Sequence, residues 1–279
     1  MLTNILVALS ATMGRADTTG YTPSGLWFSA TGTGPAVVLL HGATLDSRAW
    51  GSLPGEIARH HRVVLTDLRS HGRSRDATAP FSWAEDVIEV MDAAGIDRAI
   101  LIGHSLGAQI AIDAALQSPE RITGLVLLGP SVGGLPPTRA PAGMDSLVAA
   151  LRAGDWPGTA RALAAMPTMK LMRDSTERSL VRSILADNVR LFRVDRTWVK
   201  PLDPPALGRL GQIAVPTLVV LGGLDPTEDE AASQVLLARV PAARATTLPG
   251  CGHLLPVDCP AETTQVVASF VSAPTRRTP

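Results

Sequence analysis

Short apolar runs alternate along this chain with longer amphipathic stretches, and few folds accommodate that alternation. Four apolar runs are predicted as buried strands: AVVLL (36–40), RVVLT (62–66), RAILIG (98–103) and GLVLLG (124–129). Three longer stretches are predicted as helices: 47–58, 82–95 and 106–117. Continuous apolar strands separated by helices are typical of a parallel sheet with helices on both faces. The sequence therefore predicts an α/β fold.

The alternation of predicted strands and helices stops after residue 129 and resumes near residue 216. Between them lie Pro-rich joints around helical pieces such as MDSLVAALRA and TERSLVRSILADNVRLF. The core is then completed by two strands and a closing helix, at 216–223, 244–249 and 261–272. An insertion within a continuing pattern predicts a helical lid, also called a cap, rather than a separate domain. We expect residues 1–133 and 203–279 to form the core and 134–202 to form the lid.

Charge and hydropathy exclude several classes of partner. The 279 residues include 25 Lys plus Arg and 25 Asp plus Glu, so no net field attracts nucleic acid or an anionic membrane. Apolar residues make up 46% of the chain, but no stretch reaches the roughly 20 apolar residues of a membrane-spanning helix. We expect a small-molecule substrate, no nucleic acid, no membrane, and a monomer or homodimer.

The N-terminus and the two cysteines bear on the cellular compartment. MLTNILVALSATMGRADTT has an apolar run followed by small residues, as a signal peptide does, but no Lys or Arg precedes the run. A cytoplasmic location is therefore preferred over secretion. Cys251 and Cys259 are too few for a disulfide framework, so two free thiols are expected. A local bridge stays open as the alternative, because their spacing permits it.

Two pentapeptides fit the Gly-x-Ser-x-Gly spacing of a nucleophilic serine on a sharp turn: GHSLG at 103–107 and GPSVG at 129–133. Both follow a predicted strand, so the difference lies downstream. LGAQIAIDAALQ after Ser105 is a good helix, whose first N–H groups would face an oxyanion. VGGLPPTRAP after Ser131 cannot begin a helix. Ser105 is the predicted nucleophile, with a tight turn that merely ends a strand as the structural alternative.

A serine hydroxyl needs a base, and the base needs a carboxylate. Among six histidines, His253 lies in the Gly-bounded loop GCGHLLPVDCP, between the last strand and the last helix. From there its side chain can reach the strand ends. Asp225 in GGLDP directly follows a buried strand, although such a residue could instead cap the next helix. Ser105, Asp225 and His253 form the predicted catalytic triad.

Acyl transfer also needs two N–H donors for the oxyanion. We expect them from the backbone of Leu106, which follows the nucleophile, and of Ala43, in the loop after the strand at 36–40. An ordinary Gly turn is the alternative for the second loop. No metal ion and no organic cofactor is predicted. Six residues are candidates for the substrate pocket, with packing inside the lid as the alternative for the lid residues: His41, His104, Ser131, Met169, Phe192 and Trp198.

Together these motifs resemble the α/β-hydrolase family, in its branch of serine esterases, lactonases, cofactor-free haloperoxidases and C–C bond hydrolases. The resemblance covers about residues 25–133 and 203–272. It rests on five ordered motifs: LLHG, DLRSHGRS, GHSLG, GGLDP and GCGHLLPVDCP. It implies the α/β-hydrolase fold, with Ser105 as nucleophile, His253 as base and Asp225 orienting the base. Because the nucleophile position holds serine rather than aspartate, the resemblance does not extend to haloalkane dehalogenases.

The resemblance also assigns structural roles. In DLRSHGRS, Ser70 stands where the family usually has glycine, and Asp67 and Arg69 are expected to brace loops. Asp258 matches an acidic position before the last helix and is expected to cap it.

The expected reaction is hydrolysis of a small to medium, largely apolar ester or lactone through an acyl-serine intermediate. Other outcomes stay open because the pocket, not the fold, decides the chemistry. The same site could perform cyclisation, C–C bond cleavage or perhydrolysis. The chain could also be a ligand-binding receptor with weak turnover.

Overall fold

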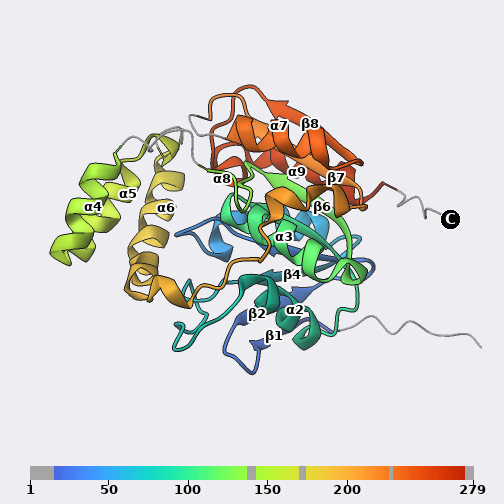
Figure 1. The fold of residues 1–279 in the computed structure, drawn as a ribbon, viewed down its shortest axis with the longest axis horizontal. Helices are drawn as coiled ribbons and strands as arrows, with labels where there is room; N and C mark the ends of the chain where they lie inside the picture. Colours follow the sequence, from blue (N-terminus) through green and yellow to red (C-terminus); the bar gives the residue numbers. More distant parts are fainter. Residues whose placement is uncertain (1–15, 137–142, 170–173, 226–228, 274–279) are drawn as a thin grey trace, which may run out of the picture.

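An eight-stranded sheet forms the centre of the computed structural model, which describes residues 16–136, 143–169, 174–225 and 229–273 (Figure 1). Its strands are β1 (Thr18–Tyr21), β2 (Trp27–Thr31), β3 (Ala36–Leu40), β4 (Arg62–Thr66), β5 (Ala99–His104), β6 (Ile122–Leu128), β7 (Thr217–Gly222) and β8 (Ala243–Leu248). The spatial order is β1-β2-β4-β3-β5-β6-β7-β8. The pairs β1–β2 and β2–β4 are antiparallel, and all others are parallel. The prediction of a mostly parallel sheet is confirmed.

Helices cover both faces of this sheet. The helices outside the predicted lid are α1 (Leu53–Ile57), α2 (Trp83–Ala93), α3 (Leu106–Gln117), α7 (Asp229–Arg239), α8 (Leu255–Asp258) and α9 (Pro260–Val271). Strand β3 illustrates the layering, since Val38 and Leu40 pack with α2 and α3 while Val37 and Leu39 pack with α1 and α9. This alternation follows from the two-residue period of a strand. Among the described residues, no helix is both long and apolar enough to cross a bilayer.

Two local predictions need correction. The helix expected at 47–58 is divided into a short 3-10 helix, η1 (Ser47–Trp50), and α1. Gly51 separates them at φ +52°, a left-handed conformation that ends a helical turn. The antiparallel strands β1 and β2 were not expected from the sequence, because β1 is largely exposed and both are short. The proposed leader, residues 1–15, lies outside the described residues.

The described part of the segment predicted as a lid contains three α-helices: α4 (Met144–Ala153), α5 (Trp156–Ala164) and α6 (Ser175–Asn188). Figure 1 draws them side by side, standing away from the sheet next to α8. Their buried aliphatic residues form one cluster with residues of the core: Leu147, Leu163, Met169, Val181, Ile184, Leu185 and Val189 meet Leu45, Ala49, Leu254 and Val257. Of the three helices, α6 contacts η1 after β3, α5 packs on α6, and α4 packs on α5 (Figure 1).

Polar bonds anchor the end of α6 to the core. Asn188 is fully buried, and its Nδ2 donates to the Leu45 carbonyl (3.2 Å) and to Asp46 Oδ2 (3.0 Å). Its Oδ1 accepts the Gly72 N–H at 2.7 Å. Arg190, in the following 3-10 turn, donates to the Gly72 carbonyl at 2.8 Å. Because the buried Asn188 amide bonds to three partners at once, it fixes the orientation of the end of α6 relative to the core.

The loop that Asn188 contacts is the DLRSHGRS segment. Asp67 is buried, and its two carboxylate oxygens accept the N–H groups of Ser47 and Arg73, each at 2.8 Å. Arg69 pairs with Asp86 of α2 at 2.5 Å. Ser70 has φ +66°, a conformation that glycine adopts at no steric cost. The bracing roles implied for Asp67 and Arg69 are therefore present in the structure.

Candidate active site

Ser105 occupies a strained turn between β5 and α3. Its φ of +53° and ψ of −114° lie outside the common regions for a residue with a side chain. The flanking glycines make this turn possible: a Cβ on Gly103 would collide with the Gly107 carbonyl, and one on Gly107 with the Leu40 carbonyl. Strain of this kind persists only where the surrounding structure enforces it, and it often marks a functional site.

Ser131 lies close to Ser105 but on a different kind of turn. It follows β6, and no helix begins in residues 131–136. Its Oγ is 3.4 Å from the Ser105 carbonyl oxygen and 3.5 Å from Oε1 of Gln109. Ser131 is half-buried beside the backbone of the predicted nucleophile.

His253 and Asp225 are hydrogen bonded. His253 Nδ1 is 2.7 Å from Asp225 Oδ2, and the two side chains are only 10% and 4% exposed. They meet because β7 and β8 are parallel neighbours, so the segments that follow both strands leave the same edge of the sheet. The carboxylate can only accept, so Nδ1 carries the proton and Nε2 is left to act as a base.

The contact between the histidine loop and the serine turn runs through His104. This residue immediately precedes Ser105, and its Nε2 is 2.9 Å from the carbonyl oxygen of His253. The centroids of the two imidazole rings are 5.0 Å apart. The predicted base therefore lies against the residue next to the predicted nucleophile.

The predicted oxyanion donors come from neighbouring strands. β3 and β5 are paired in parallel, with Leu40 opposite Gly103, so the loops that follow them are adjacent. Ala43 lies in the first loop and is exposed, while Leu106 opens α3. In the part of the chain that the structure describes, neither N–H has a protein acceptor. Both donors are therefore available to a ligand.

His41 and His104, two of the predicted pocket residues, are both buried and line a small cavity. His41 is 1% exposed, its Nε2 accepts the Leu68 N–H (2.9 Å), and its Nδ1 is 2.9 Å from the Gly42 carbonyl oxygen. Burial lowers the pKa of His41 to about 4 and that of His104 to about 3. The cavity that both line, with Leu254, has a volume of about 10 Å³. That space holds one water at most.

The predicted pocket residues of the lid separate into two groups. Met169 is buried in the aliphatic cluster of the lid, and Phe192 packs against that cluster. Trp198 is half-buried elsewhere, where its carbonyl accepts the N–H of Phe81 at 2.8 Å. Met169 therefore packs inside the predicted lid, which was the alternative to a place in the substrate pocket.

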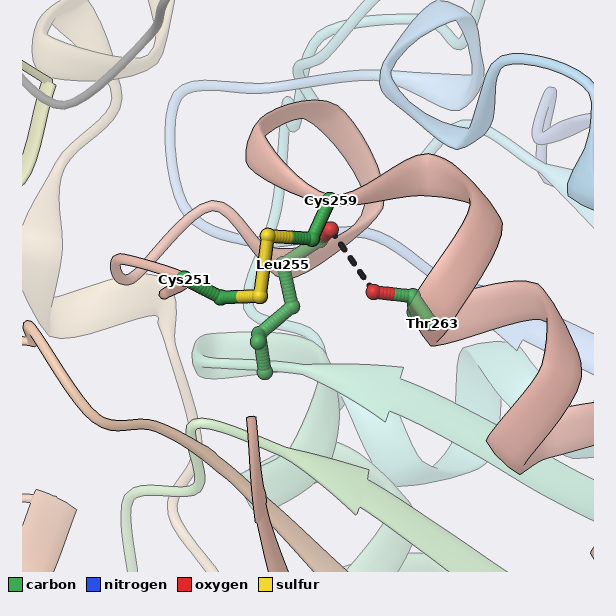
Figure 2. Close-up of a disulfide and its surroundings, with 4 residues drawn as sticks. All are labelled: Cys251, Leu255, Cys259 and Thr263. Atoms are coloured by element: carbon green, nitrogen blue, oxygen red, sulfur yellow. Dashed lines mark hydrogen bonds between the residues drawn. A yellow bond between two sulfur atoms is a disulfide. The ribbon is translucent and has the colours of Figure 1, made fainter. Parts of the chain in front are cut away.

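Cys251 and Cys259 form a disulfide, so the expectation of two free thiols was wrong (Figure 2). Their Cα atoms are 5.8 Å apart, within the range that a disulfide spans. The turn of α8 between them brings the ends together, and Leu255 lies between the sulfurs and α9 with its carbonyl accepting the Thr263 hydroxyl at 2.8 Å. The disulfide closes a ring that contains His253.

Asp258 does not cap the last helix as expected. The residue is 8% exposed, and within the described residues neither carboxyl oxygen accepts a well-formed hydrogen bond. Burial raises its pKa to about 6, which the nearby Leu254 backbone offsets only in part, and Glu177 of α6 raises it further. Within the described ranges, no group of His, Cys, Asp and Glu side chains is arranged to hold a metal ion.

Sequence reasoning missed two features of this site and gave a third, the disulfide, only as an alternative. The backbone contact of His104, the disulfide and the buried Asn188 all join segments far apart in the chain or depend on the path of a loop. None carries a local sequence signal beyond the residue type. A buried polar residue in a predicted lid was the only available pointer to Asn188.

Comparison with known proteins gives consistent matches over most of the chain. A pimeloyl-[acyl-carrier protein] methyl ester esterase of Xanthomonas oryzae pv. oryzae is 30% identical over 234 residues, covering 80% of this chain and 89% of that protein. A solved hydrolase of Pseudomonas aeruginosa PA01 is 27% identical with a TM-score of 0.75, covering 92% and 98% of the two chains.

A third similar protein is the solved structure of Est816, described as an N-acyl homoserine lactone degrading enzyme. It is 25% identical with a TM-score of 0.71, and the match covers 88% of this chain and 96% of that one. The family model described as the alpha/beta hydrolase family matches residues 37–266. This range contains the serine turn, both partner loops and the inserted helices. The chain belongs to the alpha/beta hydrolase family.

Proposed function

We propose that this protein is a serine hydrolase that acts on a small to medium, largely apolar ester or lactone through an acyl-Ser105 intermediate. The observation that carries the proposal is the hydrogen-bonded pair of Asp225 and His253, packed against the residue that precedes a strained serine. Similarity to a methyl ester esterase and to a lactone-degrading enzyme supports this substrate class.

In the acylation step, Ser105 Oγ attacks the substrate carbonyl and its proton passes to His253 Nε2. Asp225, which accepts the Nδ1–H of His253, stabilises the imidazolium that forms. The side chain of Asp225 is 4% exposed, so little water screens this attraction. Collapse of the tetrahedral intermediate returns the proton to the leaving alcohol and leaves the acyl group on Ser105.

The negative charge of the tetrahedral intermediate falls on the former carbonyl oxygen. The N–H groups of Leu106 and Ala43 donate to it, and the N-terminus of α3 adds a partial positive charge. Removing one such donor typically costs about 3 kcal/mol of transition-state stabilisation. Water then attacks the acyl-enzyme with His253 again as base, which releases the acid. Each proton moves between side chains, substrate and water, so this scheme uses no metal ion or organic cofactor.

We also propose that residues 134–202 act as a lid that shapes the acyl pocket. Its helices rest on Leu45, beside the loop of Ala43, and on Leu254, the neighbour of His253. The surface between the lid and the site is thus aliphatic. An aliphatic wall binds an apolar acyl or alkoxy group by the hydrophobic effect and offers little to a charged one.

The test combines a covalent probe with two serine variants. The purified chain is treated with a fluorophosphonate, and its hydrolysis of p-nitrophenyl butyrate and of an aliphatic γ-lactone is measured. We expect labelling and turnover to vanish in Ser105→Ala, and labelling to persist in Ser131→Ala, the serine of the matched pentapeptide. Undiminished turnover by Ser105→Ala, with an unchanged circular dichroism spectrum, refutes the proposal. Absence of labelling in the wild type would instead favour a ligand-binding role.

A further inference from the structure

The loop that carries His253 has little regular structure of its own. Residues 249–254 join β8 to α8 without helix or strand, and two of the four residues that precede His253 in this loop are glycines, Gly250 and Gly252. The position of His253 therefore depends on individual contacts. Asp225 holds its ring, and the His253 carbonyl oxygen accepts the Leu255 N–H at 2.9 Å, a bond within the same segment of the chain.

The side chain of His104 fixes that backbone. Its Nε2 lies 2.9 Å from the His253 carbonyl oxygen, and a carbonyl can only accept, so Nε2 carries the proton and donates. The other edge of the ring faces the oxyanion loop: a Cβ added to Gly42 would lie 2.6 Å from His104 Nδ1. With 2% exposure, His104 fills the space between these two loops.

His104 is also held in its neutral form. Burial, followed by the proximity of His253, lowers the pKa of His104 to about 3. When His253 becomes an imidazolium during the reaction, His104 therefore adds no second positive charge beside it. With its pKa this low, the unprotonated Nδ1 of His104 is too weak a base to compete with His253 for the Ser105 proton.

We propose that His104 is a positioning residue: its Nε2–H sets the backbone of His253, and its ring sets the distance between the His253 loop and the Gly42 loop. This inference rests on the proposed serine chemistry. Serine and base must be held to within a fraction of an ångström, because a displacement of about 1 Å can cost about 100-fold in rate. Substrate does not touch His104, so its replacement acts on kcat rather than on KM.

The test compares variants that keep or lose the donor. In His104→Gln an amide N–H can reach the position of Nε2, His104→Asn is one methylene too short, and His104→Phe keeps the ring without a donor. For p-nitrophenyl butyrate we expect His104→Phe and His104→Asn to lose 10- to 100-fold in kcat, with KM within about threefold of wild type. We expect His104→Gln to recover kcat to within about fivefold. Fluorophosphonate labelling rates should follow kcat.

Stability is measured on the same samples, with kcat calculated per folded molecule by circular dichroism. If His104→Phe does not fold, the comparison of His104→Gln with His104→Asn decides. Equal kcat in the Gln and Asn variants, or kcat within twofold of wild type in His104→Phe, overturns the inference. Ser105→Ala keeps the two proposals apart: loss of turnover in that variant, with full turnover in His104→Phe, refutes only the positioning role.

Discussion

Opening the Cys251–Cys259 disulfide should destabilise the protein by an amount that the ring size sets. The sequence separation is 8, so the closed ring has nine residues. For such a ring the chain-entropy relation gives about 2.6 kcal/mol at 25 °C, since cross-linking removes conformations from the unfolded chain. In a chain of this length each kcal/mol shifts the melting temperature by roughly 2 °C. We therefore expect a decrease of about 5 °C.

Two samples measure this effect independently. The first is wild type with a phosphine reductant, which changes only the S–S bond but must reach sulfurs on residues that are 2% and 5% exposed. The second is the Cys251→Ser, Cys259→Ser double variant, which needs no reductant. Thermal unfolding by circular dichroism gives the melting temperature, and the turnover of p-nitrophenyl butyrate gives kcat. We expect the melting temperature to fall because the unfolded chain gains conformations. We expect kcat to fall as well, because the ring contains His253.

The double variant treated with the phosphine reductant is the matched control. Its melting temperature and kcat should not change when the reductant is added. A shift below about 1 °C in both the reduced wild type and the double variant would show that the ring contributes no stability. A full shift in melting temperature with unchanged kcat would show that the bond stabilises the fold without positioning His253. Either result contradicts part of the reasoning.

Substitutions at three further positions test other parts of the structure. The pKa of Asp258 is raised from 3.8 to about 6, so the folded state binds its proton more tightly, and the cost of ionisation grows as pH rises from about 4 to about 6. Asp258→Asn should therefore gain up to about 3 kcal/mol in urea unfolding at pH 7 relative to wild type, and little at pH 4. Equal gains at both pH values would contradict this. Asn188→Ala removes the acceptor of the part-buried Gly72 N–H and the donor to the Leu45 carbonyl and should cost about 3 kcal/mol, while a change below 1 kcal/mol would count against the anchoring role. Ser70→Ala loses the Oγ that accepts the Ala77 N–H at 3.0 Å and keeps the left-handed backbone, whereas Ser70→Gly loses the bond but relieves the strain. The glycine variant should be more stable than the alanine variant by about 1 kcal/mol, and the reverse order would refute the strain argument.

The core elements were predictable because their signals are local. β3 matches the run AVVLL residue for residue, and α3 matches the stretch after Ser105. A strand buried on both faces must be apolar throughout, so its bounds are visible in the sequence. The exposed strand β1 lacks that signal, and the expected helix at 47–58 was divided by the conformation of one glycine.

The candidate site was predictable only as a set of residue types at strand ends. The sequence order of Ser105, Asp225 and His253 pointed to them, but their distances depend on which strands are neighbours. Disulfide formation between Cys251 and Cys259 depends on the turn of α8 between them, which their spacing does not determine. The pairing of His104 with the His253 carbonyl spans 149 positions of the chain, and no local pattern encodes such a contact.

The anchoring of α6 through Asn188 has a practical consequence for engineering the substrate range. The segment at 67–74 donates or accepts bonds to both the core and the lid, so a mutagenesis library there would return mainly poorly expressed clones. In helix α4, Leu147 is the buried residue, and the remaining positions of the helix are not buried. Under the proposed lid role, diversity introduced on α4 would alter the substrates that are accepted while the expression yield of the library is preserved.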